Sequence, residues 1–124
     1  ENNGKLSELG KLLLKSDCYD PLEDCEGQDI QCDMEIYERV WSEASWMRRS
    51  GELLESGKNI GCPVLAIHGD YDPHPFEGVE IPLSETLNDF KFRLLEKCGH
   101  KPWIEKYARK EFFRIIEEEL AGIK

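Results

Sequence analysis

The architecture is set by residues 63–73, which read PVLAIHGDYDP. The apolar run of residues 64–67 lies between a proline and a glycine, and such an unbroken run is typical of a strand buried on both faces, as in a parallel sheet. A polar segment follows, in which Pro73 and Pro75 fix the backbone and exclude a helix. The sequence therefore predicts a buried parallel strand that ends in a rigid polar loop.

A second strand is predicted shortly after this loop. Residues 81–87 have a short helical pattern, and residues 90–95 alternate between apolar and polar side chains before they end apolar. A strand, a helical crossover and a second strand form a βαβ unit, whose strands are parallel and whose crossover is almost always right-handed. We therefore expect an α/β fold with two parallel strands and flanking helices.

Two helices are predicted before this unit. Four leucines at helical spacing, between residues 6 and 13, favour a short amphipathic helix. Asp33 is a suitable N-cap for a second helix, whose apolar positions recur every three or four residues from 36 to 47. We expect this helix to end near Gly51 or to continue with a kink for a few residues.

One helix is predicted after the unit. It is expected to begin at Pro102, since proline suits the first turn of a helix, and Gly122 can end it. Apolar side chains at four-residue steps from 104 to 120 form its stripe. The chain thus divides into a helical segment, residues 1–60, and a βαβα segment, residues 61–124.

Composition excludes several classes of protein. The chain has 124 residues, which suits one domain, and its 16 Lys and Arg against 26 Asp and Glu give a formal net charge of −10. Nucleic-acid binding needs clustered basic side chains, so we expect no nucleic-acid partner and no anionic membrane surface. No apolar run approaches the ~18 residues of a membrane span, so no membrane segment is expected either.

The five cysteines carry a prediction about redox state. An odd number cannot pair fully within one chain, and the sequence has no C-x-x-C pair and no zinc-type Cys/His spacing. We therefore expect reduced thiols, a cytoplasmic location, no structural metal and no cofactor. The cysteines are Cys18, Cys25, Cys32, Cys62 and Cys98.

A run of nine carboxylates without a single Lys or Arg extends over residues 17–38. Such a run is typical of a solvated loop or edge segment. A calcium site is the alternative, and the solvated segment is the simpler interpretation.

Polar side chains follow both predicted strands at their carboxyl ends. Asp72 comes after the first strand and His100 after the second, and these ends meet at one edge of a parallel sheet, where ligands bind in such folds. A carboxylate that accepts a hydrogen bond from one imidazole nitrogen leaves the other nitrogen free as a general base. The residues alone also allow an ordinary turn aspartate and a histidine that hydrogen-bonds the start of the next helix.

Two stretches of the chain resemble the α/β-hydrolase family. Residues 63–73 resemble its acid-bearing strand and turn, P-[apolar run]-H-G-x-x-D-P, and residues 99–105, GHKPWIE, resemble its histidine loop, G-H-x-P-x-x-E. The order and spacing of the two motifs fit the last βαβ unit of that fold. The resemblance implies that Asp72 is the acid and His100 the base of a catalytic triad that acts on a small-molecule substrate. Residues 1–60 would then derive from the segment that leads out of the cap or lid.

The family's nucleophile lies on a G-x-S-x-G elbow upstream of the acid. No serine of this chain has glycine two residues to each side, and the chain begins at Glu1 without an initiator methionine. We therefore expect the C-terminal part of a longer α/β-fold hydrolase of ester, amide or related bonds. Loss of the nucleophile costs on the order of a million-fold in rate, so the part alone should be inactive.

Other candidate site residues have simpler explanations. The spacing of Asp70, Asp72 and His74 faintly resembles a calcium loop, but Pro75 occupies the position that requires glycine. His68 is more simply a hydrogen-bonded strand histidine than a ligand. Cys98 precedes His100 closely enough to be its nucleophile, yet the resemblance assigns that position to a strand end.

A non-catalytic role is the alternative to the hydrolase. Two parallel strands leave open edges that favour strand pairing between chains. The chain could then be an acidic protein-interaction module that forms homo-oligomers through its exposed sheet edge.

Overall fold

The structure is a computed structural model in which residues 2–22 and 33–122 are described. Residues 23–32 of the predicted acidic run, with Cys25 and Cys32, therefore lie outside the described residues. None of the described helices is long and apolar enough to cross a membrane.

In chain order the elements are α1 (Asn2–Ser16), α2 (Met34–Ser50), α3 (Glu52–Ser56), the 3-10 turn η1 (Gly57–Asn59), β1 (Val64–Gly69), α4 (Glu77–Thr86), β2 (Phe90–Leu95), the 3-10 turn η2 (Pro102–Ile104) and α5 (Arg109–Ala121).

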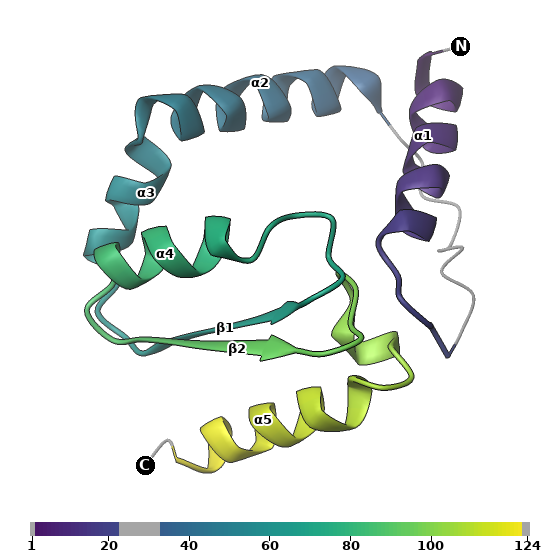
Figure 1. The fold of residues 1–124 in the computed structure, drawn as a ribbon. Coiled ribbons are helices and arrows are strands. Elements are labelled where there is room, and N and C mark those ends of the chain that lie inside the picture. The colour runs from purple at the N-terminus through teal and green to yellow at the C-terminus, as the bar shows by residue number, and fades with distance from the viewer. Residues whose placement is uncertain (1, 23–32, 123–124) are drawn as a thin grey trace.

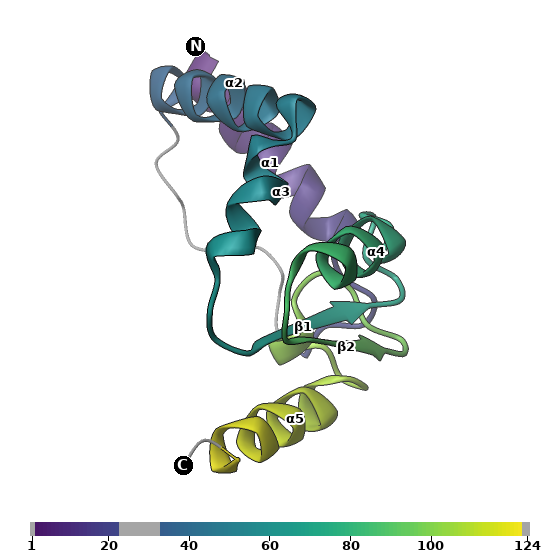
Figure 2. The same ribbon diagram turned by 90° about the vertical axis from the view of Figure 1, so that its left-hand side faces the viewer.

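The two strands pair in parallel and confirm the predicted βαβ unit. Their register runs from Val64 opposite Phe90 to Gly69 opposite Leu95, so both strands end at the same edge of the sheet. Figure 1 shows α4 on one side of the strands and α5 on the other, and Figure 2 shows the same layers from the side. The chain is thus a mixed α/β structure with helices flanking a two-stranded parallel sheet.

The buried core lies between the sheet and α5. Its members come from the end of β2, the histidine loop and the start and apolar stripe of α5, and full burial of a leucine or isoleucine among them contributes about 1.5–3 kcal/mol. This core fixes α5 against the strands and so holds the loop between β2 and α5, which carries His100. Its residues are Leu95, Cys98, Ala108 and Ile115, with Leu65, Ile67 and Phe112 packed against them.

The predicted ends of α2 are confirmed. The Asp33 carboxylate accepts hydrogen bonds from the backbone N–H groups of Glu35 and Ile36 at 3.0 and 3.1 Å, which satisfies two of the unpaired donors of the first turn. Gly51 ends the helix with a φ of 83°, a left-handed conformation that glycine adopts without steric cost. The short helix α3 follows directly.

The prediction for α4 is wrong at its start. The helix begins at Glu77, not at residue 81, and Pro82 lies inside it although proline removes one helical hydrogen bond. Tertiary contact explains the earlier start: the ring of Phe76, which precedes the helix, stacks on Phe92 of β2 with centroids 6.2 Å apart. Packing against the strand therefore outweighs the local cost of the proline.

The last helix also begins later than predicted. Pro102 opens only the short turn η2, and α5 begins at Arg109. The backbone is extended at Glu105, with ψ at 126°, which interrupts the helical path. This extension turns the Glu105 side chain into the interior, where it is fully buried.

The apolar stripes predicted for α1 and α2 remain largely exposed to solvent. Leu12 of α1 is 68% exposed, and Ile36 and Trp41 of α2 are 61% and 46% exposed. The periodicity therefore predicts the helices correctly, but these side chains do not join the core around Leu95.

Candidate active site

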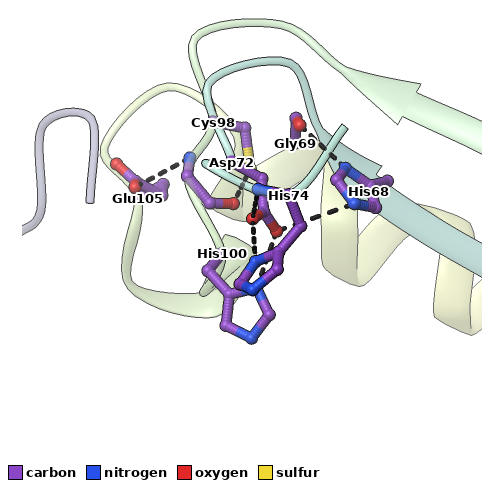
Figure 3. A network of polar contacts seen from close by, with 8 residues as sticks. His68, Gly69, Asp72, His74, Cys98, His100 and Glu105 are labelled. Atoms are coloured by element: carbon purple, nitrogen blue, oxygen red, sulfur yellow. Dashed lines mark hydrogen bonds and ion pairs between the residues drawn. The ribbon is translucent and has the colours of Figure 1, made fainter. Parts of the chain in front are cut away.

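The ends of the two strands bring Asp72 and His100 into direct contact. His100 Nδ1 lies 2.6 Å from Asp72 Oδ2, in loops that follow β1 and β2 at the same sheet edge. Figure 3 shows the two side chains pointing toward each other. The structure thus brings together the two residues singled out as acid and base.

Asp72 is held as a carboxylate in a nearly closed environment, since its side chain is only 4% exposed. Burial alone raises the pKa of this group. Hydrogen bonds from the His74 backbone and from the His100 and His74 rings outweigh that effect, so the pKa of Asp72 lies below its ordinary value. Asp72 is therefore ionised at neutral pH and can stabilise a positive charge on a neighbouring imidazole.

The contact with Asp72 fixes how His100 carries its proton. A carboxylate only accepts hydrogen bonds, so His100 Nδ1 bears the proton that it donates to Asp72. Nε2 of the neutral ring then has a free lone pair. Because the His100 side chain is 50% exposed, this nitrogen can accept a proton from another molecule or segment.

His74, which the sequence suggested only as a member of a calcium loop, is a further member of the site. Its Nδ1 and its backbone N–H lie 2.8 and 2.9 Å from Asp72 Oδ1. His68 completes the surroundings of Asp72, with Nε2 at 3.7 Å from Oδ2 and Nδ1 bonded to the Gly69 carbonyl oxygen. The position of His74 between two prolines, close to Asp72, is a signal that could have drawn attention to it.

The Asp72–His100 pair lines a pocket of about 740 Å³, a size that suits a small-molecule ligand. The first two helices contribute to the same wall through Leu13, Ser16 and Trp41. The Ser16 hydroxyl donates to the Leu13 carbonyl oxygen at 2.8 Å. Within residues 2–22 and 33–122, no serine hydroxyl is hydrogen-bonded to His100.

Glu105 organises the loop that carries His100. Its Oε1 accepts hydrogen bonds from the backbone N–H groups of Gly99 and Tyr19 at 3.0 and 2.7 Å, and Oε2 accepts one from Asp20 at 2.8 Å. Hydrogen bonds to a buried carboxylate are stronger than those between neutral groups. One side chain therefore ties the histidine loop to the segment that follows α1. In the sequence, the only sign of this role is that Glu105 is the last residue of the G-H-x-P-x-x-E motif.

The segment that follows α1 braces the histidine loop directly as well. The His100 backbone N–H donates to the Asp17 carbonyl oxygen at 2.6 Å. A Cβ atom at Gly99 would lie 2.1 Å from that same oxygen, so only glycine fits there. The close approach explains why glycine precedes the histidine in this loop.

Asp70 has a structural role at the base of the site. Its Oδ1 accepts a hydrogen bond from the Cys98 backbone N–H at 3.1 Å and so joins the loop after β1 to the loop after β2. This hydrogen bond gives the Asp70 carboxylate a structural role that does not require a bound calcium ion.

Cys98 is unsuited to act as a nucleophile. Its side chain is fully buried, and burial together with the negative charge of nearby carboxylates raises the pKa of the thiol to about 12. The thiolate is the reactive form of cysteine, so this thiol is inert near neutral pH. Its packing in the core is the role that the structure assigns to it.

The expectation of reduced thiols is wrong for Cys18, which is disulfide-bonded. Cys62 and Cys98 are free. An odd number of cysteines excludes complete pairing within one chain but allows a disulfide between two of them, and no pattern in the sequence indicates which cysteines pair.

Comparisons with protein-family models, with curated proteins and with solved structures find no match to this chain. A functional assignment therefore has to come from the geometry around Asp72 and from the two motifs that contain the contacting residues.

Asp72→Asn is expected to destabilise the fold at neutral pH and to do so less as the pH falls from about 5 to 2. A lowered folded-state pKa stabilises the fold above the unfolded-state pKa, and this contribution is lost as the pH falls through the folded-state value. Urea unfolding of both proteins across this range measures the difference. If the difference in unfolding free energy did not change with pH, the folded-state pKa of Asp72 would not be lowered, which would contradict the stabilised carboxylate described above.

Proposed function

We propose that this chain is the C-terminal part of an α/β-fold hydrolase and supplies the acid, Asp72, and the base, His100, of its catalytic triad. The 2.6 Å contact between these residues, at the carboxyl ends of two parallel strands, carries the proposal. The two motifs that resemble the family contain these same residues. The substrate class is a small molecule with an ester, amide or related bond.

The geometry suits general base catalysis by His100. Its Nε2 takes the proton of a nucleophile supplied by a segment outside this chain, while the nucleophile forms a bond to the carbonyl carbon of the substrate. The ring then passes that proton to the leaving group. Asp72 keeps Nδ1 protonated and stabilises the imidazolium, which the low pKa of its carboxyl favours.

The proposal is tested by restoring a complete triad. The chain is co-expressed with the polypeptide encoded directly upstream of Glu1, if that polypeptide carries a G-x-S-x-G elbow, and a small activated ester is assayed. Hydrolysis is expected with both parts together and not with either part alone. An upstream sequence without a nucleophile elbow, or a folded complex without hydrolysis, would oppose the proposal.

The disulfide at Cys18 bears on the compartment that we propose for the protein. Disulfide bonds persist in oxidising compartments and are rare in the reducing cytosol. The disulfide at Cys18 therefore counts against the cytoplasmic location predicted from the cysteine count. Alkylation of free thiols in the natural protein, followed by mass spectrometry, tests which state Cys18 has in the cell.

Self-association is a second candidate role, favoured by the apolar surface of the first two helices. A groove of about 440 Å³ there is lined by apolar side chains that include Leu9, Leu13, Ile36 and Trp41. Apolar surfaces of this kind often mark interaction sites. Light scattering of the purified chain is expected to give the mass of an oligomer, whereas a monomer at high protein concentration contradicts this role.

A further inference from the structure

We propose that Asp72, His74 and His100 form a binding site for a divalent transition-metal ion such as Zn²⁺. One ligand atom from each residue can be chosen so that all three lie within 4.8 Å of one another. Figure 3 shows both histidine rings converging on the one carboxylate. The expectation that the chain holds no metal rested on the absence of cysteine pairs and of zinc-type Cys/His spacing. Those patterns do not include a site made of one aspartate and two histidines.

The distances are close to those that a zinc ion requires. Tetrahedral zinc binds nitrogen and oxygen at about 2.0–2.2 Å, which separates its ligand atoms by about 3.3 Å. His74 Nδ1 lies 2.8 Å from Asp72 Oδ1, and His100 Nδ1 lies 2.6 Å from the other oxygen, Oδ2. An outward rotation of the two rings would open this space, and the solvent on their exposed sides, 71% and 50% of each side chain, leaves room for that rotation.

The donor set selects the class of metal. Two imidazole nitrogens and one carboxylate oxygen suit zinc, cobalt and nickel, whereas calcium and magnesium prefer sites built from oxygen. The exposure of His74 and His100 leaves room for water to complete the coordination.

His74 has no part in the proposed hydrolytic mechanism. A triad requires one imidazole on the acid, yet each oxygen of Asp72 faces a different histidine ring here. Zinc binding gives the second ring a role. His68, the third histidine of the chain, lies outside the proposed set, because its Nδ1 is bonded to the Gly69 carbonyl oxygen and its side chain is only 10% exposed.

Metal binding and base catalysis exclude each other at this site, a consequence that rests on the proposed function. An ion held by Asp72 and a nitrogen of His100 displaces the proton that the two residues share. His100 then cannot accept a proton under the control of Asp72. Zinc would act as an inhibitor of the restored enzyme, and a chelator would relieve the inhibition.

The site is tested by calorimetric titration of the full chain with Zn²⁺. All proteins carry Cys62→Ser, because Cys62 is a free, exposed thiol that could bind the ion itself. One Zn²⁺ per chain is expected. His74→Ala should weaken binding more than about tenfold, since removal of a mere outer-shell partner of a metal ligand already costs 10–100-fold. The exposed position of His74 leaves the fold intact, which circular dichroism verifies.

His68→Gln is the matched control, because it removes a histidine that neighbours Asp72 but lies outside the proposed ligand set. It should keep the Zn²⁺ affinity. Binding that survives His74→Ala, binding that His68→Gln weakens equally, or a Kd weaker than about 1 mM contradicts the site. These measurements need no substrate, so a failed ester assay would overturn the hydrolase proposal and leave the metal result standing.

Discussion

His100→Ala is expected to lower kcat for an activated ester by about 10⁴–10⁶-fold in the enzyme restored with its upstream part. The alanine removes the nitrogen that takes the proton of the nucleophile, and no other described imidazole has the same placement. His74 binds the opposite oxygen of Asp72, and His68 is nearly buried. The steady-state rate of ester hydrolysis at saturating substrate gives the measurement.

Two controls separate loss of the base from loss of structure. The first control is Lys91→Ala, which removes a cation that pairs with Glu119 of α5. Lys91 lies at the start of β2, at the opposite end of the strand from His100, so this variant should leave kcat unchanged. Added imidazole should restore part of the rate of His100→Ala, because a free base can enter the space that the ring leaves. Full activity in His100→Ala would show that the assignment of the base is wrong.

Glu105→Ala is expected to lower the free energy of unfolding by about 3 kcal/mol, because it leaves one buried and two partly buried backbone N–H groups without an acceptor, and a buried donor left unpaired costs about 1–3 kcal/mol. These donors belong to Gly99, Tyr19 and Asp20. A loss of this size is a large share of the 5–15 kcal/mol of a typical domain. Urea unfolding followed by circular dichroism measures it.

Glu105→Gln is the matched control for this prediction. Glutamine keeps one carbonyl oxygen, which can still accept hydrogen bonds from the N–H groups of Gly99 and Tyr19. Its amide nitrogen cannot accept a hydrogen bond, so only the Asp20 N–H loses its acceptor. The expected loss is therefore smaller, about 1–3 kcal/mol. Equal stability of Glu105→Ala and the wild type would mean that the carboxylate does not hold the histidine loop.

The central part of the fold was predictable because its signals are local. An apolar run of strand length with proline before it and glycine after it marks β1, and the next alternating segment marks β2. Parallel pairing then places the loops after both strands at one edge, and this topology alone anticipates the contact of Asp72 with His100.

The supporting contacts were not predictable, because they join residues far apart in the chain. Glu105 lies within a pattern that is compatible with a continuous helix from Pro102, whereas in the structure its backbone is extended and its side chain bonds Tyr19 and Asp20, more than 80 residues earlier. Similarly, sequence spacing places His74 near Asp72 but does not show that its ring turns back onto the carboxylate.

The most direct measurement of the central claim is the rate at which a fluorophosphonate labels the elbow serine of the upstream part, followed by mass spectrometry. This reagent reacts with a nucleophile that a general base activates, so the measurement does not depend on the unknown substrate. With this chain present, labelling should be rapid, and with the His100→Ala chain it should be about 10²–10⁴-fold slower. Equal labelling rates with the two chains would contradict the account.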